Sequence, residues 1–284
     1  MNRQNKRFYA ALEGVAAFVL WSTLAIFFNI VKLPISVYVV FGSLVGLCLL
    51  YLYFFITKHG LPNFSFSLPL IGLFLIAAIK GVVWFKALTI YPVADAFIIH
   101  NLAPLLALLI APIAIKEKSS FNHFVAIITG FIGLVVLLKF DHQGQTIFAL
   151  GALFAFVAAI CSAMQNVIQR KLIKEVSSMQ QAFIFVLGQA LGSVLFLPSS
   201  GMNISLYDIW GILFFGIVGT ALPIILLSRT YKHLRSFEVA TLGYTEPLLG
   251  AIWGSLFLHQ PIVLSTAIGG ILIFLSGLTA IKEK

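Results

Sequence analysis

The sequence alternates between long apolar runs and short breaks that hold charged residues or proline, as at Lys32–Pro34, Tyr91–Pro92 and Gln260–Pro261. Each run has roughly the 17–25 residues that an α-helix needs to cross a hydrocarbon core. The runs are continuous and lack the period-two alternation that marks the strands of a membrane β-barrel. The pattern therefore predicts an all-α membrane protein with ten transmembrane helices, at residues 10–30, 35–57, 67–89, 94–115, 121–139, 147–168, 181–199, 206–228, 236–258 and 262–281.

Composition agrees with this pattern. Of the 284 residues, 61% are hydrophobic and 10% are charged, whereas soluble domains are nearer one half apolar and one quarter charged. A water-soluble fold could not hide so much apolar surface, so the lipid bilayer is the expected solvent. The two cysteines lie inside apolar runs and the six histidines have no ligand spacing. The sequence thus predicts no metal and no cofactor.

The positive charge of the chain lies in the breaks between the runs. The net charge of +9 is not gathered on one face, so we expect no nucleic acid partner and interpret the basic residues as topology signals. With the N-terminus inside, the inner connections and termini hold 14 Lys and Arg, and the outer ones hold only Lys32 and Lys139. This bias predicts a multi-pass protein of the cell inner (cytoplasmic) membrane with both termini in the cytoplasm.

The two halves of the chain resemble each other. Residues 84–118 align without a gap with residues 227–261, at an offset of 143 residues. The alignment pairs like charges and a shared Pro-Leu-Leu block, namely Lys86 with Arg229, Asp95 with Glu238, and Pro104 with Pro247.

This offset predicts two five-helix repeats, residues 1–143 and residues 144–284, called here the first and second halves. Because each half contains an odd number of spans, the second half must enter the membrane from the opposite side. Inverted repeats of this kind are typical of secondary transporters, whose substrate site lies near the midplane between the halves.

Two segments carry a resemblance to a known family. Residues 94–118 end in Lys116-Glu117, and residues 237–260 contain Glu246-Pro247. These segments, with the Gly-rich spans that come after them, resemble the EamA type of the drug/metabolite transporter superfamily. The resemblance implies export or exchange of small metabolites, often amino acids, without ATP. The second segment ends in His259-Gln260, so a role for the acidic residue at this position survives only in the first half.

Two charges lie near the middle of predicted spans, Lys80 in the third and Glu246 in the ninth. A charge at bilayer depth costs roughly 2.5–3.5 kcal/mol on insertion scales, so each needs a reason. In the functional interpretation Lys80 binds a substrate carboxylate, while Glu246 pairs with Lys80 or carries a coupling proton. In the structural interpretation the two residues form a pair that locks the halves together.

Aromatic and polar side chains add further candidates for substrate binding. Trp84 lies one turn after Lys80, where a ring beside a cation suits an amino acid or an aromatic metabolite. Each candidate has an alternative role in helix packing or backbone hydrogen bonding. The other candidates are Trp21, His100, Asn101, Gln165, Asn166 and Tyr244.

Pro104 and Pro247 occupy matching positions in the fourth and ninth spans. Proline removes a backbone N–H and opens the helix before it, and paired broken helices point to the site of a transporter. We expect both prolines to act as hinges, with a static kink as the alternative.

These features favour a secondary-active or facilitative transporter of small metabolites such as amino acids, with export favoured, working by alternating access. The alternative is a flippase of the same fold for lipid or hydrophobic solutes. An enzyme is not expected, because no nucleophile–base pair or metal cluster occurs at membrane depth. The expected partners are a small-molecule substrate and the bilayer, with proton coupling open and a monomer or homodimer as the assembly.

Overall fold

The computed structural model describes residues 3–56, 67–91, 93–137, 150–199, 203–259 and 264–281. These residues form α-helices and one π-helix, and no strand occurs among them. Lys58, Pro92, Lys139, the side chain of Asp95 and the break at Gln260–Pro261 lie outside this description. The all-helical fold class predicted from the sequence is confirmed.

Helix covers most of each of the ten predicted ranges, where described; the seventh range, 181–199, extends beyond the end of its helix at Val194. Four of these segments are broken into shorter pieces, and the others are single helices. The helices are α1 (Arg3–Ser22), α2 (Leu24–Ile30), α3 (Ile35–Ile56), α4 (Leu68–Ile90), α5 (Val93–His100), α6 (Ala103–Ile115), α7 (Phe121–Leu137), α8 (Leu150–Leu172), α9 (Ser178–Val194), α10 (Leu206–Phe214), η1 (Phe215–Ala221), α11 (Leu222–Thr230), α12 (Ser236–Leu242), α13 (Thr245–Leu258) and α14 (Leu264–Ile281).

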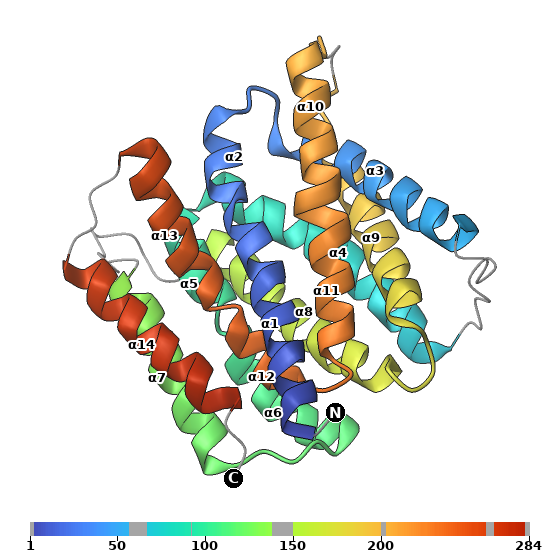
Figure 1. Ribbon diagram of the computed structural model, residues 1–284. Helices are drawn as coiled ribbons and strands as arrows, with labels where there is room; N and C mark the ends of the chain where they lie inside the picture. The colour runs from blue at the N-terminus through green and yellow to red at the C-terminus, as the bar shows by residue number, and fades with distance from the viewer. Residues whose placement is uncertain are drawn as a thin grey trace.

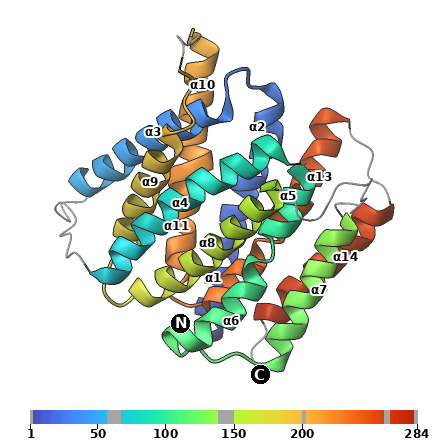
Figure 2. The same ribbon diagram turned by 180° about the vertical axis from the view of Figure 1, so that it is seen from behind.

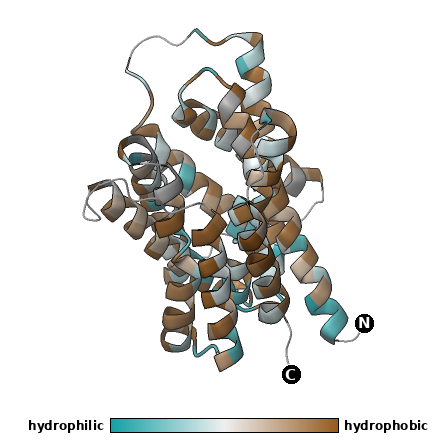
Figure 3. Ribbon diagram, turned by 90° about the vertical axis from the view of Figure 1, so that its left-hand side faces the viewer, coloured by the Kyte–Doolittle hydropathy of each residue, from teal (hydrophilic) through white to brown (hydrophobic). Residues whose placement is uncertain are grey.

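Many of the segments can cross a bilayer by length and composition. Five described stretches are long and apolar enough: Gln4–Phe28, Ile35–Leu52, Ala96–Ile115, Leu150–Leu172 and Leu206–Thr230. Three shorter apolar helices lie within α4, α7 and α14. Hydrophobic residues cover most of these helices, while hydrophilic ones gather near helix ends such as the start of α1 (Figure 3). Ten crossings remain the prediction from the sequence.

The helices pack in pairs that join distant parts of the chain. α7 and α14 lie side by side at one edge of the molecule (Figure 1). α4 lies against α8 and α9, as the view from behind makes clear (Figure 2). On the other side of the bundle, α1 packs against α11 and α3 against η1.

Glycine allows the closest of these approaches. A Cβ added to Gly269 of α14 would lie 2.5 Å from the carbonyl oxygen of Gly133 in α7. One added to Gly192 of α9 would lie 2.1 Å from the carbonyl oxygen of Ala78 in α4. Small residues at helix contacts let backbones approach closely and are typical of membrane helix pairs.

Two backbone features recur at the offset of the predicted repeat. Lys116 ends α6 with φ 54°, and His259 ends α13 with φ 53°. Each of the two donates its N–H to the carbonyl five residues earlier, at Ala111 and Gly254. The four positions agree with the 143-residue offset of the alignment.

The contacts between helices also agree with the predicted repeat. The pairs α4–α8 and α4–α9 each join a helix of the first half to one of the second; when the halves are exchanged they correspond to α11–α1 and η1–α3, and α7–α14 corresponds to itself. A repeat of residues 1–143 and 144–284 predicts this correspondence. The boundary itself falls outside the described residues.

Candidate functional site

Lys80 lies on the protein-facing side of α4. Its neighbours at one-turn spacing, Ala77 and Val83, are buried, yet Lys80 itself is only half-buried. The Nζ atom donates to Oε1 of Gln165 in α8 at 3.2 Å and lies 5.9 Å from the ring centroid of Phe185 in α9.

Glu246 lies in the first turn of α13 and is half-buried. Lys80 and Glu246 are close enough to attract each other electrostatically across the interior. The described residues nevertheless contain no ion pair within 4.0 Å between them, and no hydrogen bond to the Glu246 carboxylate. The two predicted charges therefore attract each other without direct contact.

Aromatic side chains lie beside Lys80. The rings of Trp84 and His100 are tilted against each other with centroids 4.5 Å apart, and Trp84 meets Phe97 edge-on at 5.1 Å. His100 Nε2 is 2.8 Å from the hydroxyl of Ser162 in α8. The structure thus brings four predicted residues, Lys80, Trp84, His100 and Gln165, into one cluster.

Ser162 belongs to this cluster but was not predicted. A serine in a membrane helix is common and often bonds only to nearby backbone. The available signal was its spacing, because Ser162, Gln165 and Gln169 share one face of α8. Gln165 Nε2 donates to Oε1 of Gln169 at 3.3 Å, so this face forms a continuous polar stripe.

The indole N–H of Trp21 is occupied by a hydrogen bond to the backbone. Its indole N–H donates to the carbonyl of Gly219 in η1 at 2.8 Å. In an α-helix that carbonyl would accept from residue 223, but residue 223 is proline and has no N–H. The indole thus adds a donor to the Gly219 carbonyl, four residues before the proline that lacks an N–H, and only the ring of Trp21 remains for contact with a substrate.

Replacing Trp21 by phenylalanine should lower the free energy of unfolding by about 0.5–1.5 kcal/mol for the lost hydrogen bond, in addition to any loss of packing. In a Pro223→Ala background the restored N–H of residue 223 can bond to Gly219, so the same change should cost less. Thermal unfolding in detergent of the four proteins of this double-mutant cycle measures the difference. An equal cost in both backgrounds would show that the indole does not compensate for Pro223.

The remaining predicted polar residues are held by other parts of the protein. Asn101 donates from Nδ2 to the carbonyl of Phe97 at 2.8 Å, within its own segment. Asn166 accepts a hydrogen bond from the hydroxyl of Tyr231. Tyr244 is fully buried in an apolar cluster between α7 and α14, away from Lys80. The structure does not bring these three residues into the Lys80 cluster.

Both predicted hinge prolines come directly after a break in their helix. α5 ends at His100 and α6 begins at Ala103, with Pro104 in its first turn. α12 ends at Leu242 and α13 begins at Thr245, with Pro247 in its first turn. The breaks lie at matching positions of the two halves. Movement about them remains a prediction.

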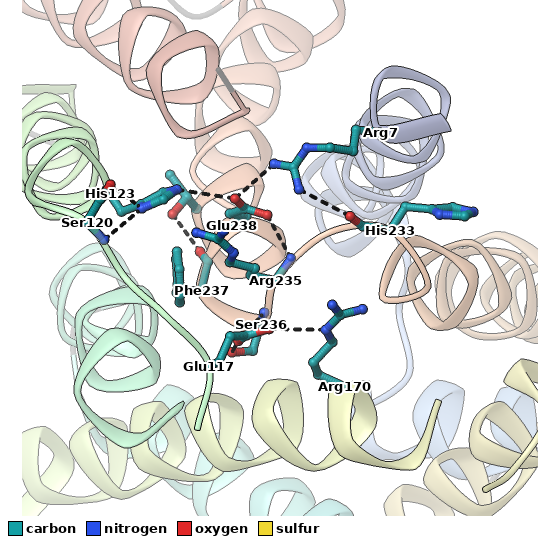
Figure 4. A network of polar contacts seen from close by, with 11 residues as sticks. Arg7, Glu117, Ser120, His123, Arg170, His233, Arg235, Ser236, Phe237 and Glu238 are labelled. Carbon is teal, nitrogen blue, oxygen red and sulfur yellow. Dashed lines mark hydrogen bonds and ion pairs between the residues drawn. The ribbon is translucent and has the colours of Figure 1, made fainter. Parts of the chain in front are cut away.

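A network of polar contacts joins distant segments at the end of the molecule where both termini lie (Figures 1 and 4). At its centre is Glu238 of α12, whose side chain is fully buried. Glu238 Oε1 is 3.0 Å from Arg7 of α1 and 3.3 Å from Nε2 of His123 in α7. Oε2 accepts from the backbone N–H of Arg235 at 2.7 Å. His123 Nδ1 accepts from the N–H of Ser120, so its Nε2 carries the proton that faces Glu238.

Glu117 forms a second centre of this network. Its carboxylate lies 3.1 Å from Nε of Arg170 in α8 and accepts from the N–H and the hydroxyl of Ser236, at 3.0 and 2.5 Å (Figure 4). Arg170 also donates to the carbonyl of Tyr231. Glu117 thus ties the end of the fourth predicted span to α8 and to the start of α12. In the sequence, the acidic position that follows this segment is occupied only in the first half, by Glu117; the second half has His259-Gln260 there.

His233 contributes to the network through its backbone. Its carbonyl accepts from Arg7 at 3.3 Å. Partial burial and then the nearby cation Lys6 lower the pKa of the His233 imidazole. The ring is therefore neutral near pH 7 and adds no positive charge beside Arg7.

Comparison with known proteins gives a consistent result. The model of the EamA-like transporter family matches residues 9–139 and, separately, residues 149–281. An S-adenosylmethionine uptake transporter of Rickettsia bellii (strain RML369-C) is 26% identical over 223 residues, which is 77% of this chain and 75% of the relative. The pseudopaline exporter CntI of Pseudomonas aeruginosa (strain UCBPP-PA14) is 24% identical over 257 residues, 89% of this chain and 88% of the relative.

A solved crystal structure has the same fold. It superposes with a TM-score of 0.81 at 23% sequence identity, and the match covers 96% of both chains.

Within the described residues, no group of three His, Cys, Asp or Glu side chains could hold a metal ion.

Proposed function

Since this chain belongs to the EamA-like transporter family, it is a multi-pass membrane transporter rather than an enzyme, and we propose that it moves small metabolites such as amino acids. In this proposal transport is secondary-active or facilitative and proceeds by alternating access between the two inverted halves. The protein lies in the cytoplasmic membrane, with both termini in the cytoplasm.

The observation that carries the proposal is the cluster around Lys80. A half-buried lysine with an amide, a hydroxyl and aromatic rings close by suits a small solute that carries a carboxylate. The ammonium binds the carboxylate, and the rings of Trp84 and His100 provide a wall for the rest of the solute. The position of the cluster among α4, α5 and α8, with Glu246 of α13 attracting Lys80, fits a site between the halves.

Two further features support alternating access. The broken helices at Pro104 and Pro247 provide matching points at which each half can bend. The network of Glu117 and Glu238 closes the expected cytoplasmic end by linking α1, α7, α8 and α12. This network has to separate before the site can open to the cytoplasm, so it acts as the inner gate.

The two relatives differ in substrate and in the direction of transport. One takes up S-adenosylmethionine and the other exports pseudopaline, so the family includes both directions. Neither name concerns a lipid, which gives the flippase alternative no support. In the proposal, net direction is set by the gradients of the solute and of any coupled ion.

Flux into proteoliposomes tests the proposal. Purified protein, reconstituted in liposomes loaded with unlabelled solute, is expected to take up the same radiolabelled solute by exchange, above the rate of empty liposomes. The panel contains amino acids, nucleosides, S-adenosylmethionine and hydrophobic drugs. Movement of a fluorescent phospholipid between leaflets without movement of any soluble solute would instead favour a flippase, and no movement at all would contradict both.

A further inference from the structure

Gln169 of α8 is an amide in the interior of the bundle, where it is only 1% exposed. Burying an amide costs free energy unless it is hydrogen-bonded, and leucine, which is of comparable size, would fill the position without that cost. In the part of the chain that the structure describes, Gln169 makes one hydrogen bond, in which its Oε1 accepts from Nε2 of Gln165 at 3.3 Å. An amide at this position therefore serves Gln165.

The chemistry of Lys80 fixes the direction of this bond. An ammonium has N–H donors and no acceptor, so it can meet an amide only at its oxygen. Gln165 presents Oε1 to Nζ of Lys80 at 3.2 Å, which leaves Nε2 for Gln169. Gln169 must then offer an oxygen. The three side chains form a directed relay, in which Gln169 holds the Gln165 amide with its oxygen toward the cation.

The relay is absent at the equivalent positions of the aligned repeat. The 143-residue offset gives each member an equivalent position, namely Pro223 for Lys80, Ser22 for Gln165 and Ile26 for Gln169. Pro223 and Ser22 lie on α11 and α1, which pack against each other as α4 and α8 do. This helix contact thus forms without either amide. Both amides occur where the cation occurs, and both are missing where it is missing.

From this arrangement we infer that Gln169 is a positioning residue for the site at Lys80 and acts through Gln165. The inference rests on the proposed function and adds to it a residue that orders the site. A lysine side chain is long and flexible, and a site that must first order it binds its solute more weakly. Gln165 restrains the ammonium before the solute arrives, and Gln169 restrains Gln165. The remaining N–H donors of Lys80 are left for the solute.

Binding to the full-length protein in detergent tests this role. The probe is the radiolabelled solute of the flux panel that the wild type binds most tightly. Gln169→Leu removes the acceptor and should weaken binding about 3- to 10-fold, which corresponds to one neutral hydrogen bond. Gln169→Glu keeps an acceptor oxygen at the same distance from the backbone, so its affinity should stay within about 3-fold of the wild type.

A double-mutant cycle separates action through Gln165 from a direct effect of Gln169. In a Gln165→Leu background the relay is already broken, so Gln169→Leu should change the affinity less than about 2-fold. An equal effect of Gln169→Leu in both backgrounds would show that Gln169 does not act through Gln165, and it would overturn the inference.

Gln181 of α9 provides a matched control. It is also a buried glutamine, and it donates a hydrogen bond of the same length, 3.3 Å, to the backbone carbonyl of Val176. Gln181→Leu should leave the affinity within about 2-fold of the wild type, because no relay ends at this residue. Equal losses of affinity in Gln181→Leu and Gln169→Leu would assign both to disturbed packing and contradict the positioning role.

The ammonium of Lys80 gives a second readout that needs no solute. With lysine labelled by a nitrogen isotope for NMR, the Nζ resonance of Lys80 is assigned by its loss in Lys80→Met. Gln169→Leu should shift this resonance in the wild-type background and leave it in place in the Gln165→Leu background. An unshifted resonance in Gln169→Leu alone would overturn the inference. If the resonance shifts while no solute of the flux panel moves, the relay stands and the proposed transport function does not.

Discussion

Replacing Lys80 by methionine is expected to weaken solute binding about 10- to 150-fold, because a hydrogen bond to a charged group contributes about 1.5–3 kcal/mol. Methionine keeps most of the length of the side chain and removes only the charge. Transport in proteoliposomes should fall to the level of empty liposomes. The solute that binds most tightly in the flux panel serves as the probe.

The stability of this variant distinguishes function from structure. Because a charge at bilayer depth costs roughly 2.5–3.5 kcal/mol, its removal should leave the protein at least as stable as the wild type. A stable protein that no longer binds solute therefore supports a binding role for Lys80. A lower unfolding temperature with unchanged affinity would assign Lys80 to a structural pair with Glu246 and contradict the proposal.

The second large effect is expected at Glu238, where replacement by alanine should lower the free energy of unfolding by about 3–5 kcal/mol. The Glu238 side chain is fully buried, and that of Arg7 is 8% exposed. Without the carboxylate, the buried guanidinium of Arg7 loses its ion pair with Glu238, and His123 loses its acceptor. Thermal and denaturant unfolding in detergent measure the loss.

A more exposed ion pair provides the control for Glu238. Glu13 and Arg229 form a pair of 2.7 Å whose side chains are 29% and 53% exposed. Since solvent screens such pairs, Glu13→Ala should cost less than about 1 kcal/mol. Similar losses for Glu238→Ala and Glu13→Ala would show that the buried network contributes little to stability.

The order of the helices and the two breaks near proline could be predicted from the sequence. Hydropathy predicts a helix wherever a run is long and continuous, because backbone groups in lipid must be bonded within the segment. Proline predicts a break because it lacks an N–H, whatever surrounds it. Both signals are local, and both agree with the described structure at Pro104 and Pro247.

Features that depend on contacts between distant residues could not be predicted in this way. The bond from Trp21 to Gly219 joins residues 198 positions apart, and the pair of Arg7 and Glu238 spans 231. No local pattern marked η1, and the spacing of Ser162 on the Gln165 face of α8 gave no sign of its partner, His100. These contacts exist only once the helices have packed.

The position of Tyr244 shows a limit of helical spacing. A continuous ninth span would put Tyr244 on the same face as Pro247, near the site. The structure interrupts that span between Leu242 and Thr245, so the helical phase on one side of the break does not carry over to the other. Tyr244 packs in the apolar cluster between α7 and α14, while Glu246, just beyond the break, is half-buried.

The partners of Lys80 also have a consequence for how the protein is made. Lys80 belongs to the first half, while the amide that accepts its hydrogen bond, Gln165, and the carboxylate that attracts it, Glu246, belong to the second. Chains are synthesised from the N-terminus, so the ribosome delivers this cation to the bilayer before either partner exists. The nascent first half must keep an unbalanced ammonium in lipid until the second half is inserted. The two halves are alike in fold, but only the second half supplies the partners of Lys80, so the first half is incomplete until the second is inserted.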